Sequence, residues 1–185
     1  MKKSPIDKEA VLIERLKAQI QSGKSPTEAY SWHRPHAHPP VTQEELDHAE
    51  SILGFALPPF LKRIYLEVGN GGFGPGYGLF KLSDESQAYR FDALVQNYVS
   101  MRSMTQEEID EAFEGEEDKP ILWPEKILMI CDWGCNIYSY VDCASSAYPI
   151  LVTDANVSHS EIHIESPSLS QWLEDWLDGT LVFPG

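Results

Sequence analysis

The sequence contains no run of about 20 consecutive apolar residues, which is the length that a helix needs to cross a bilayer. Its start, MKKSPIDKEA, has a basic tip, but Asp7, Lys8 and Glu9 stand where a signal peptide has its apolar segment. We therefore expect a cytoplasmic protein that does not bind membranes.

Cysteine is scarce as well, with three residues at Cys131, Cys135 and Cys143. An odd number clustered in one region is a poor disulfide framework, which indicates a reducing compartment. The spacings C-x3-C and C-x7-C differ from the paired C-x2-C ligands of structural zinc sites. The surrounding sequence, ILMICDWGCNIYSYVDC, is apolar and rich in β-forming residues. We therefore expect buried free thiols on strands.

Basic residues are outnumbered, because 14 Lys and Arg stand against 29 Asp and Glu, a net charge of −15. Such a charge repels the phosphates of nucleic acids and anionic lipid surfaces, and it attracts basic protein surfaces. The composition thus argues against nucleic-acid binding and favours a protein partner. Solubility alone is the other explanation for the acidity.

The motifs of common enzyme sites are also missing: the sequence has no G-x-S-x-G, no P-loop and no H-E-x-x-H. The glycine-rich GNGGFGPGYG follows an expected helix and lacks the Lys and Ser/Thr of a P-loop, so we interpret it as turns. We expect no catalysis and no cofactor. A hydrolase with an unrecognised site is the remaining enzymatic alternative.

The histidines do not form a convincing metal site. His33, His36 and His38 stand among prolines with no carboxylate or cysteine interleaved. His159 and His163 lie four residues apart on an expected strand, which separates them by about 13 Å. We predict no bound metal.

Helical periodicity of the apolar residues predicts helices over residues 6–22, 42–54, 57–69, 88–101, 105–115 and 168–179. Thr42 with Glu45 and Thr105 with Glu108 have the pattern of a capping box, in which each side chain accepts the other residue's free amide. Ser168 is expected to cap the last helix.

The inward faces of two helices follow from the same periodicity. Ile52 is expected to face inward together with Leu53, and the last helix is expected to bury Trp172 and Trp176.

Strands are expected over residues 77–82, 126–131, 136–142, 150–153 and 161–164, separated by turn residues. Because helices and strands do not alternate regularly, we predict an α+β fold, not a parallel α/β fold. It has a mostly antiparallel sheet of about 4–6 strands, helices packed against it and an N-terminal helical extension. The expected domains are residues 1–39, a helix with a Pro/His-rich linker, and residues 40–185.

Residues 40–178 resemble the SUKH superfamily, which includes the Smi/Knr-type proteins. The resemblance rests on a capped helix, the Leu57-Pro58 pair that opens a second helix, and the stop at Asn70-Gly71-Gly72. Further on, LMICDWGCNIYSYVD is similar to the family's strand, glycine-centred turn and strand, and SQWLEDWL is similar to its closing helix. The resemblance implies a binding fold without catalytic residues.

What the resemblance implies for function is an immunity protein that binds and neutralises a cognate toxin, often a nuclease. A regulatory or scaffold module of the same fold is the alternative. The candidate partner-binding residues are eight carboxylates within twelve positions: Glu107, Glu108, Asp110, Glu111, Glu114, Glu116, Glu117 and Asp118. Such a density is self-repulsive unless solvent or a basic partner screens it, so a basic toxin domain is the expected partner. The loop at residues 73–77 is a second possible surface.

Overall fold

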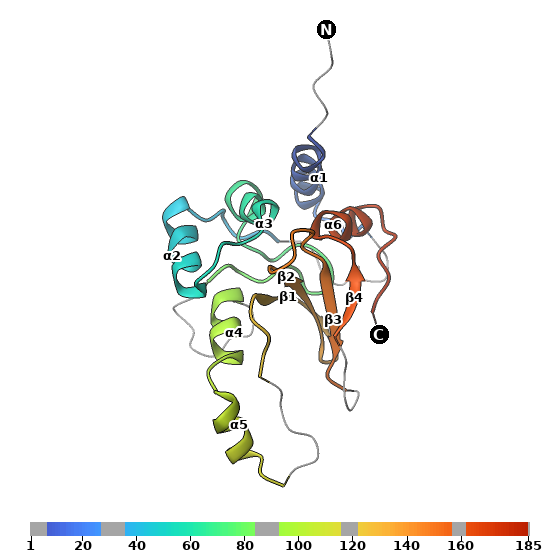
Figure 1. The fold of residues 1–185 in the computed structure, drawn as a ribbon. Coiled ribbons are helices and arrows are strands. Elements are labelled where there is room, and N and C mark those ends of the chain that lie inside the picture. Colours follow the sequence, from blue (N-terminus) through green and yellow to red (C-terminus); the bar gives the residue numbers. More distant parts are fainter. Residues whose placement is uncertain (1–6, 27–35, 84–92, 116–121, 157–161, 185) are drawn as a thin grey trace.

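The computed structural model of the protein describes residues 7–26, 36–83, 93–115, 122–156 and 162–184. Within these ranges the chain has the α+β fold that the sequence predicts (Figure 1). The helices are α1 (Lys8–Ser22), α2 (Gln43–Leu53), α3 (Pro59–Arg63), a π-helical turn η2 (Ile64–Val68), α4 (Leu94–Met101), α5 (Gln106–Ala112) and α6 (Leu169–Leu177). The strands are β1 (Ile127–Gly134), β2 (Ile137–Asp142), β3 (Ile150–Asp154) and β4 (His163–Ser166). None of the described helices combines the length and the apolarity of a membrane span.

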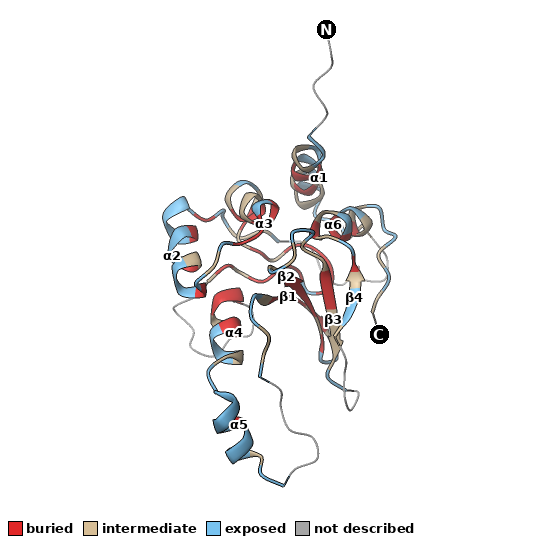
Figure 2. Ribbon diagram, viewed as in Figure 1, coloured by how far each residue is buried: buried red, intermediate tan, exposed pale blue. Residues whose placement is uncertain are grey.

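The four strands form one antiparallel sheet in the order β1-β2-β3-β4, so each strand pairs with its neighbour in the sequence. Side chains alternate between the two faces of a sheet. One row of paired side chains faces the main core: Leu128, Val141 and Ile150. The next row faces the other side: Met129, Tyr140 and Leu151. Both rows are buried, as the red central strands of Figure 2 show.

The main core lies between this sheet and the helices. Trp172 and Trp176 of α6 are 0% and 3% exposed within it, which confirms their predicted burial. α1 packs against α6 and η2, and its buried side chains Leu12, Ile13 and Leu16 belong to the same core (Figure 1). The first helix therefore shares its apolar core with the sheet.

Side-chain caps fix where the helices begin. Thr42 Oγ1 accepts the N–H of Glu45 at 3.2 Å, and the carboxylate of Glu45 accepts the N–H of Thr42 at 2.7 Å. Thr105 and Glu108 repeat both bonds at the start of α5. Both predicted capping boxes are therefore confirmed.

The prediction that Ile52 faces inward is wrong, because its side chain is 42% exposed. α2 buries Leu46, Ala49 and Leu53, which recur at steps of three and four residues. Ile52 precedes Leu53 and is rotated from it by about 100° around the helix axis, which turns it to solvent.

The predicted strand over residues 77–82 is also wrong, since only isolated bridges form there, from Leu79 to Cys131 and from Lys81 to Ala93. The N–H of Leu79 donates to the carbonyl of Phe73, and its own carbonyl accepts the N–H of Gly72, both at 2.8 Å. Toward β1, the N–H groups of Tyr77 and Phe80 donate to the carbonyls of Asp132 and Ile130 at 2.8 and 2.9 Å, but the N–H of Gly78 between them donates to Pro75 at 2.8 Å. The glycine-rich loop thus uses the Gly78 amide that a regular ladder with β1 would need.

The same loop binds the described end of the Pro/His-rich segment. The N–H groups of His36 and His38 donate to the carbonyls of Gly72 and Gly71 at 3.0 and 3.2 Å, and the N–H of Asn70 donates to His38. Gly72 has a φ of +83°, and a Cβ there would lie 2.1 Å from the carbonyl oxygen of His36. Close contact between two backbones therefore requires glycine at this position.

The helix expected over residues 57–69 changes to π-helical geometry after Arg63. The N–H of Gly69 donates to the carbonyl of Ile64, five residues earlier, at 3.1 Å. Within this π-helical turn, the backbone carbonyl of Tyr65 accepts the N–H of Val41 at 3.0 Å. The side-chain hydroxyl of Tyr65 donates to the carbonyl of Phe80 at 2.8 Å. Through Tyr65, η2 thus connects the residue before the cap of α2 with the segment that follows the glycine-rich loop.

A polar network crosses the main core between β4 and α6. The register of β3 and β4 shifts at Glu165, so this residue has no pairing partner on β3 and its carboxylate points toward the core. It accepts the Ser139 hydroxyl at 2.6 Å and the Trp172 indole N–H at 2.8 Å. Trp133 donates to Ser139 at 2.7 Å. Burial raises the pKa of Glu165, and the hydrogen bonds that Glu165 accepts from Ser139 and Trp172 oppose that rise in part.

We expect the substitution Glu165→Gln to change how stability depends on pH. A raised folded-state pKa means that Glu165 favours folding most below its unfolded pKa, and that this contribution is lost as the pH rises through the folded pKa. The free energy of unfolding of the natural protein, minus that of the Gln variant, should therefore fall as the pH rises from about 4, the unfolded pKa of a glutamate, through the raised folded pKa. Urea unfolding across this range measures it. The exposed carboxylate variant Glu44→Gln is the control, and an equal slope for both variants would contradict the assignment.

Candidate partner-binding surface

Helix α5 extends away from the sheet and from the main core (Figure 1). Figure 2 shows that nearly all of it is exposed, and Ile109 is its one buried residue. The helix exists at this position because the Thr105–Glu108 capping box starts it without help from a large apolar face. It therefore presents the acidic segment to solvent.

Four of the predicted carboxylates border a shallow hollow of about 540 Å³: Glu107, Asp110, Glu111 and Glu114. Glu107, Asp110 and Glu111 are spaced at three and four residues, which places them on one side of the helix, and Glu114 lies in the turn that follows it. We call these four residues the acidic face of α5. It brings together half of the eight residues that the sequence singles out.

Two carboxylates of this segment already have intramolecular roles. The N–H and hydroxyl of Thr105 donate to Glu108 at 2.7 and 2.9 Å and lower the pKa of Glu108. Asp110 accepts the side-chain amide of Gln106 at 3.2 Å. Within the described part of the chain, Glu107, Glu111 and Glu114 form no ion pair. Glu108 is therefore a capping residue and not part of the open surface.

The remaining three candidates, Glu116, Glu117 and Asp118, lie outside the described residues. Arg102, at the end of α4, does not pair with the acidic face. It donates to the carbonyl of Trp123 and forms an ion pair with Glu125 at 3.3 Å. The acidic face thus has no described base bound across it.

The other predicted binding surface, the loop at residues 73–77, is largely internal. Phe73 is 0% exposed and Tyr77 is 48% exposed. Five amides of the glycine-rich segment donate to carbonyls of the chain, those of Gly69, Asn70, Gly72, Tyr77 and Gly78. The loop is therefore a structural turn with one accessible aromatic side chain.

The histidines do not assemble into a metal site within the described residues, where no three His, Cys, Asp or Glu side chains lie close enough to share an ion. The His36 and His38 rings meet edge to face at 5.6 Å. His163 is exposed at the start of β4. His33 and His159 lie outside the described residues.

The cysteines differ from one another. Cys131 is buried and Cys143 partly buried, but Cys135 is exposed in the turn between β1 and β2, so its predicted burial is wrong. The turn places Cys135 at a φ of +52°, away from either strand. Burial raises the pKa of Cys131 well above its usual value and that of Cys143 to about 12. Both thiols stay protonated at neutral pH, which makes them poor nucleophiles.

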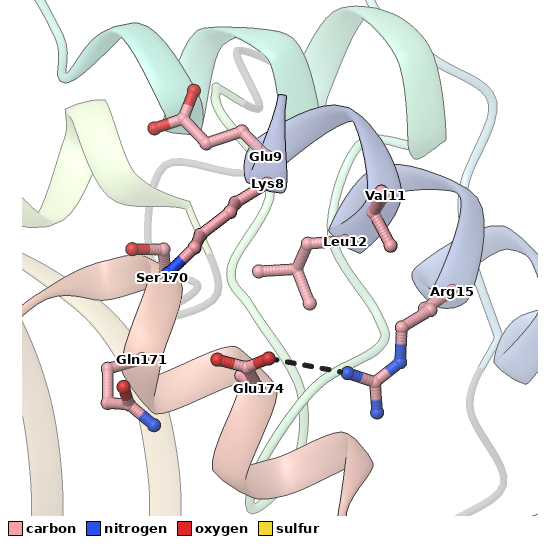
Figure 3. A pocket seen from close by; sticks show the side chains of 8 residues that line it. All are labelled: Lys8, Glu9, Val11, Leu12, Arg15, Ser170, Gln171 and Glu174. Atoms are coloured by element: carbon pink, nitrogen blue, oxygen red, sulfur yellow. Dashed lines mark ion pairs between the residues drawn. The ribbon is translucent and has the colours of Figure 1, made fainter. Parts of the chain in front are cut away.

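The sequence did not point to a groove between α1 and α6, which has a volume of about 660 Å³. Its walls come from both helices (Figure 3): Lys8, Glu9, Val11, Leu12 and Arg15 on α1, and Ser170, Gln171 and Glu174 on α6. Periodicity identifies the apolar side of each helix, but it does not say which two helices meet, so no sequence signal predicts this groove.

Comparison with protein families matches the chain to a known family over the sheet and most of the helices. The sequence profile of the SMI1 / KNR4 family (SUKH-1) matches residues 40–175, about three quarters of the chain. The match leaves α1 outside. A search among curated proteins finds no match.

Proposed function

Because the chain belongs to the SMI1 / KNR4 family (SUKH-1), we propose that it acts by binding another protein and neutralising it as an immunity protein. The partner is a toxic protein with a basic working surface, such as a nuclease. Binding is stoichiometric and needs no catalytic group of this chain.

The observation that carries the proposal is the acidic face of α5. Three of its carboxylates, Glu107, Glu111 and Glu114, are without an ion pair in the described structure, on a helix that projects from the body of the protein. Charges held together in this way repel one another, and a cationic partner relieves that repulsion. The net charge of −15 adds a long-range attraction of the whole chain for a basic partner.

A nuclease has to present a basic groove to the phosphates of its substrate. Carboxylates on one side of a helix offer negative charge in a row, so the acidic face of α5 can occupy such a groove as a mimic of phosphates. Complementary charge mainly speeds association, and salt screens it over about 8 Å at physiological ionic strength.

We expect the triple variant Glu107→Gln, Glu111→Gln, Glu114→Gln to bind its toxin partner about tenfold more slowly at low salt, because electrostatic steering raises on-rates by 10–10³. Its on-rate should also depend less on salt than that of the natural protein. The partner is first captured from the native cell, and stopped-flow mixing at several salt concentrations measures association. Glu108 is left intact because it caps α5.

The matched control carries the same change in charge at exposed positions of α1 and α2, Glu14→Gln, Glu44→Gln and Asp47→Asn. Its on-rate should stay within about threefold of the natural value. Equal on-rates for both triple variants would show that the acidic face of α5 does not bind the partner.

A separate experiment tests whether this chain neutralises the captured partner, whichever surface binds it. Co-expression of the captured partner with and without this chain should show growth arrest only when the chain is missing. A captured partner that is harmless alone would instead favour the regulatory or scaffold module, the second function that the family resemblance implies.

A further inference from the structure

α5 lies on a long connection that leaves the body of the protein after α4 and returns to it at β1 (Figure 1). Its one buried residue, Ile109, belongs neither to the main core nor to the apolar cluster on the other face of the sheet. No described helix or strand packs extensively against α5. The position of the acidic face therefore depends on the base of this connection, where the chain leaves α4 and returns before β1.

Both ends of the connection pack against the sheet. Met101, at the end of α4, and Trp123, before β1, are partly buried against the apolar cluster that contains Tyr140. The ring centroids of Trp123 and Tyr140 are 4.9 Å apart, and the indole N–H of Trp123 donates to the carbonyl of Ile127 at 2.8 Å. The returning segment is therefore fixed to the sheet.

Arg102 joins the departing segment to this returning one. It follows the last residue of α4, and its guanidinium carbon lies over the ring of Tyr98, 5.8 Å from the centroid. From there the guanidinium donates to the carbonyl of Trp123 and forms an ion pair with Glu125 at 3.3 Å. A planar guanidinium suits this position, because it can stack on a ring and donate to two acceptors at once. Arg102 therefore closes the base of the connection.

The hydrogen bond to Trp123 is the main part of this closure. The side chain of Glu125 is 77% exposed, and exposed ion pairs contribute little. A second link, in which the hydroxyl of Tyr98 accepts the N–H of Lys126 at 3.2 Å, does not involve Arg102. Replacing Arg102 should therefore loosen the base of the connection and leave Tyr98 and Trp123 in their places.

We propose that Arg102 is a positioning residue for partner binding: it holds α5 in one orientation, so that the acidic face meets a basic partner as a preformed surface. Because this role takes the acidic face as the binding surface, it rests on the proposed function. A surface already in its bound orientation avoids the entropic cost of ordering a segment on binding. The loss of this preorganisation should appear mainly in the off-rate, where the affinities of related complexes differ most.

The orientation of α5 can be measured without a partner, by pulsed electron paramagnetic resonance between two nitroxide labels on the full chain. One label is attached to Cys135, which is exposed, and the other to Ala112→Cys at the exposed end of α5. Cys131 and Cys143 react slowly because burial raises the pKa of both thiols. We expect one narrow distance distribution, and Arg102→Gln should widen it at least about twofold, because a segment with few buried contacts opens locally.

The matched control is Arg63→Gln. It removes the same charge from an arginine that pairs with Glu67 at 2.8 Å and with Asp7 at 3.6 Å, where α3 meets α1. A general loss of stability would widen the distribution in both variants, whereas loss of the closure widens it only in Arg102→Gln. A wide distribution in the natural protein, or equal widths in the two variants, would overturn the proposal.

Rates with the captured toxin partner test the consequence for binding. Arg102→Gln should dissociate about tenfold faster with an on-rate within about threefold of the natural value, and Arg63→Gln should match the natural protein in both rates. A natural off-rate for Arg102→Gln would overturn the proposal. Equal on-rates of the two triple variants described above would refute the acidic face as the binding surface, and with it the role of Arg102 in binding. The label distances would still report whether Arg102 fixes α5, so the two failures are distinguishable.

Discussion

Replacing Trp172 by alanine is expected to lower the free energy of unfolding by about 3–5 kcal/mol, the range for emptying a buried aromatic site. Trp172 is 0% exposed and is among the largest fully buried side chains of the described residues. Its ring meets that of Trp133 edge to face at 6.4 Å, and its indole N–H is bonded to Glu165. The substitution therefore creates a cavity and also leaves a buried carboxylate with one donor fewer.

Two further variants separate these effects in urea unfolding. Trp172→Phe keeps most of the ring and removes only the N–H, so it should cost less than Trp172→Ala. Val182→Ala truncates a side chain that is 77% exposed and should change stability by less than about 0.5 kcal/mol. A loss below about 1 kcal/mol for Trp172→Ala would mean that α6 is not held against the sheet as described.

The second large effect is expected from Gly72→Ala, which should cost about 2–4 kcal/mol. A side chain at a φ of +83° is strained by about 1–3 kcal/mol, and the new Cβ would also displace the carbonyl of His36, at a cost typical of overpacking. The same change at Gly54 provides the control. Gly54 has a φ of +77° but no atom within 4 Å of an added Cβ, so Gly54→Ala carries the strain alone.

Equilibrium unfolding of both glycine variants measures the difference between them. Gly72→Ala should be the less stable by at least about 1 kcal/mol, the lower limit for overpacking. If the two lose equal stability, the contact between residues 36–38 and the glycine-rich loop does not hold the native state together.

Local signals in the sequence were sufficient for the elements that depend on neighbouring residues. A capping box joins residues three apart, so Thr42–Glu45 and Thr105–Glu108 could be predicted from their spacing alone. The buried stripe of α6 follows from one helical period. The antiparallel meander was equally accessible, because its strands pair in sequence order.

The errors arise where distant residues decide the outcome. Residues 77–82 have a strand-like pattern, but the N–H of Gly78 donates to Pro75 within the glycine-rich loop, which interrupts the pairing with β1. Cys135 has apolar neighbours, yet a turn at positive φ exposes it. The acidic segment of α5 could be recognised from composition, whereas the groove between α1 and α6 became apparent only from three-dimensional positions.

The docking of α1 on α6 also bears on how the chain folds during synthesis. The ion pair of Arg15 with Asp178 joins residues 163 positions apart, whereas each pair of strands closes a short connection. Loop closure and contact order make such distant contacts late ones. α1 leaves the ribosome before its partner helix α6, and the whole sheet is made between them. Its apolar side chains Leu12, Ile13 and Leu16 therefore lack their cover from α6 until the sheet has been made, which is an interval in which a chaperone can bind them.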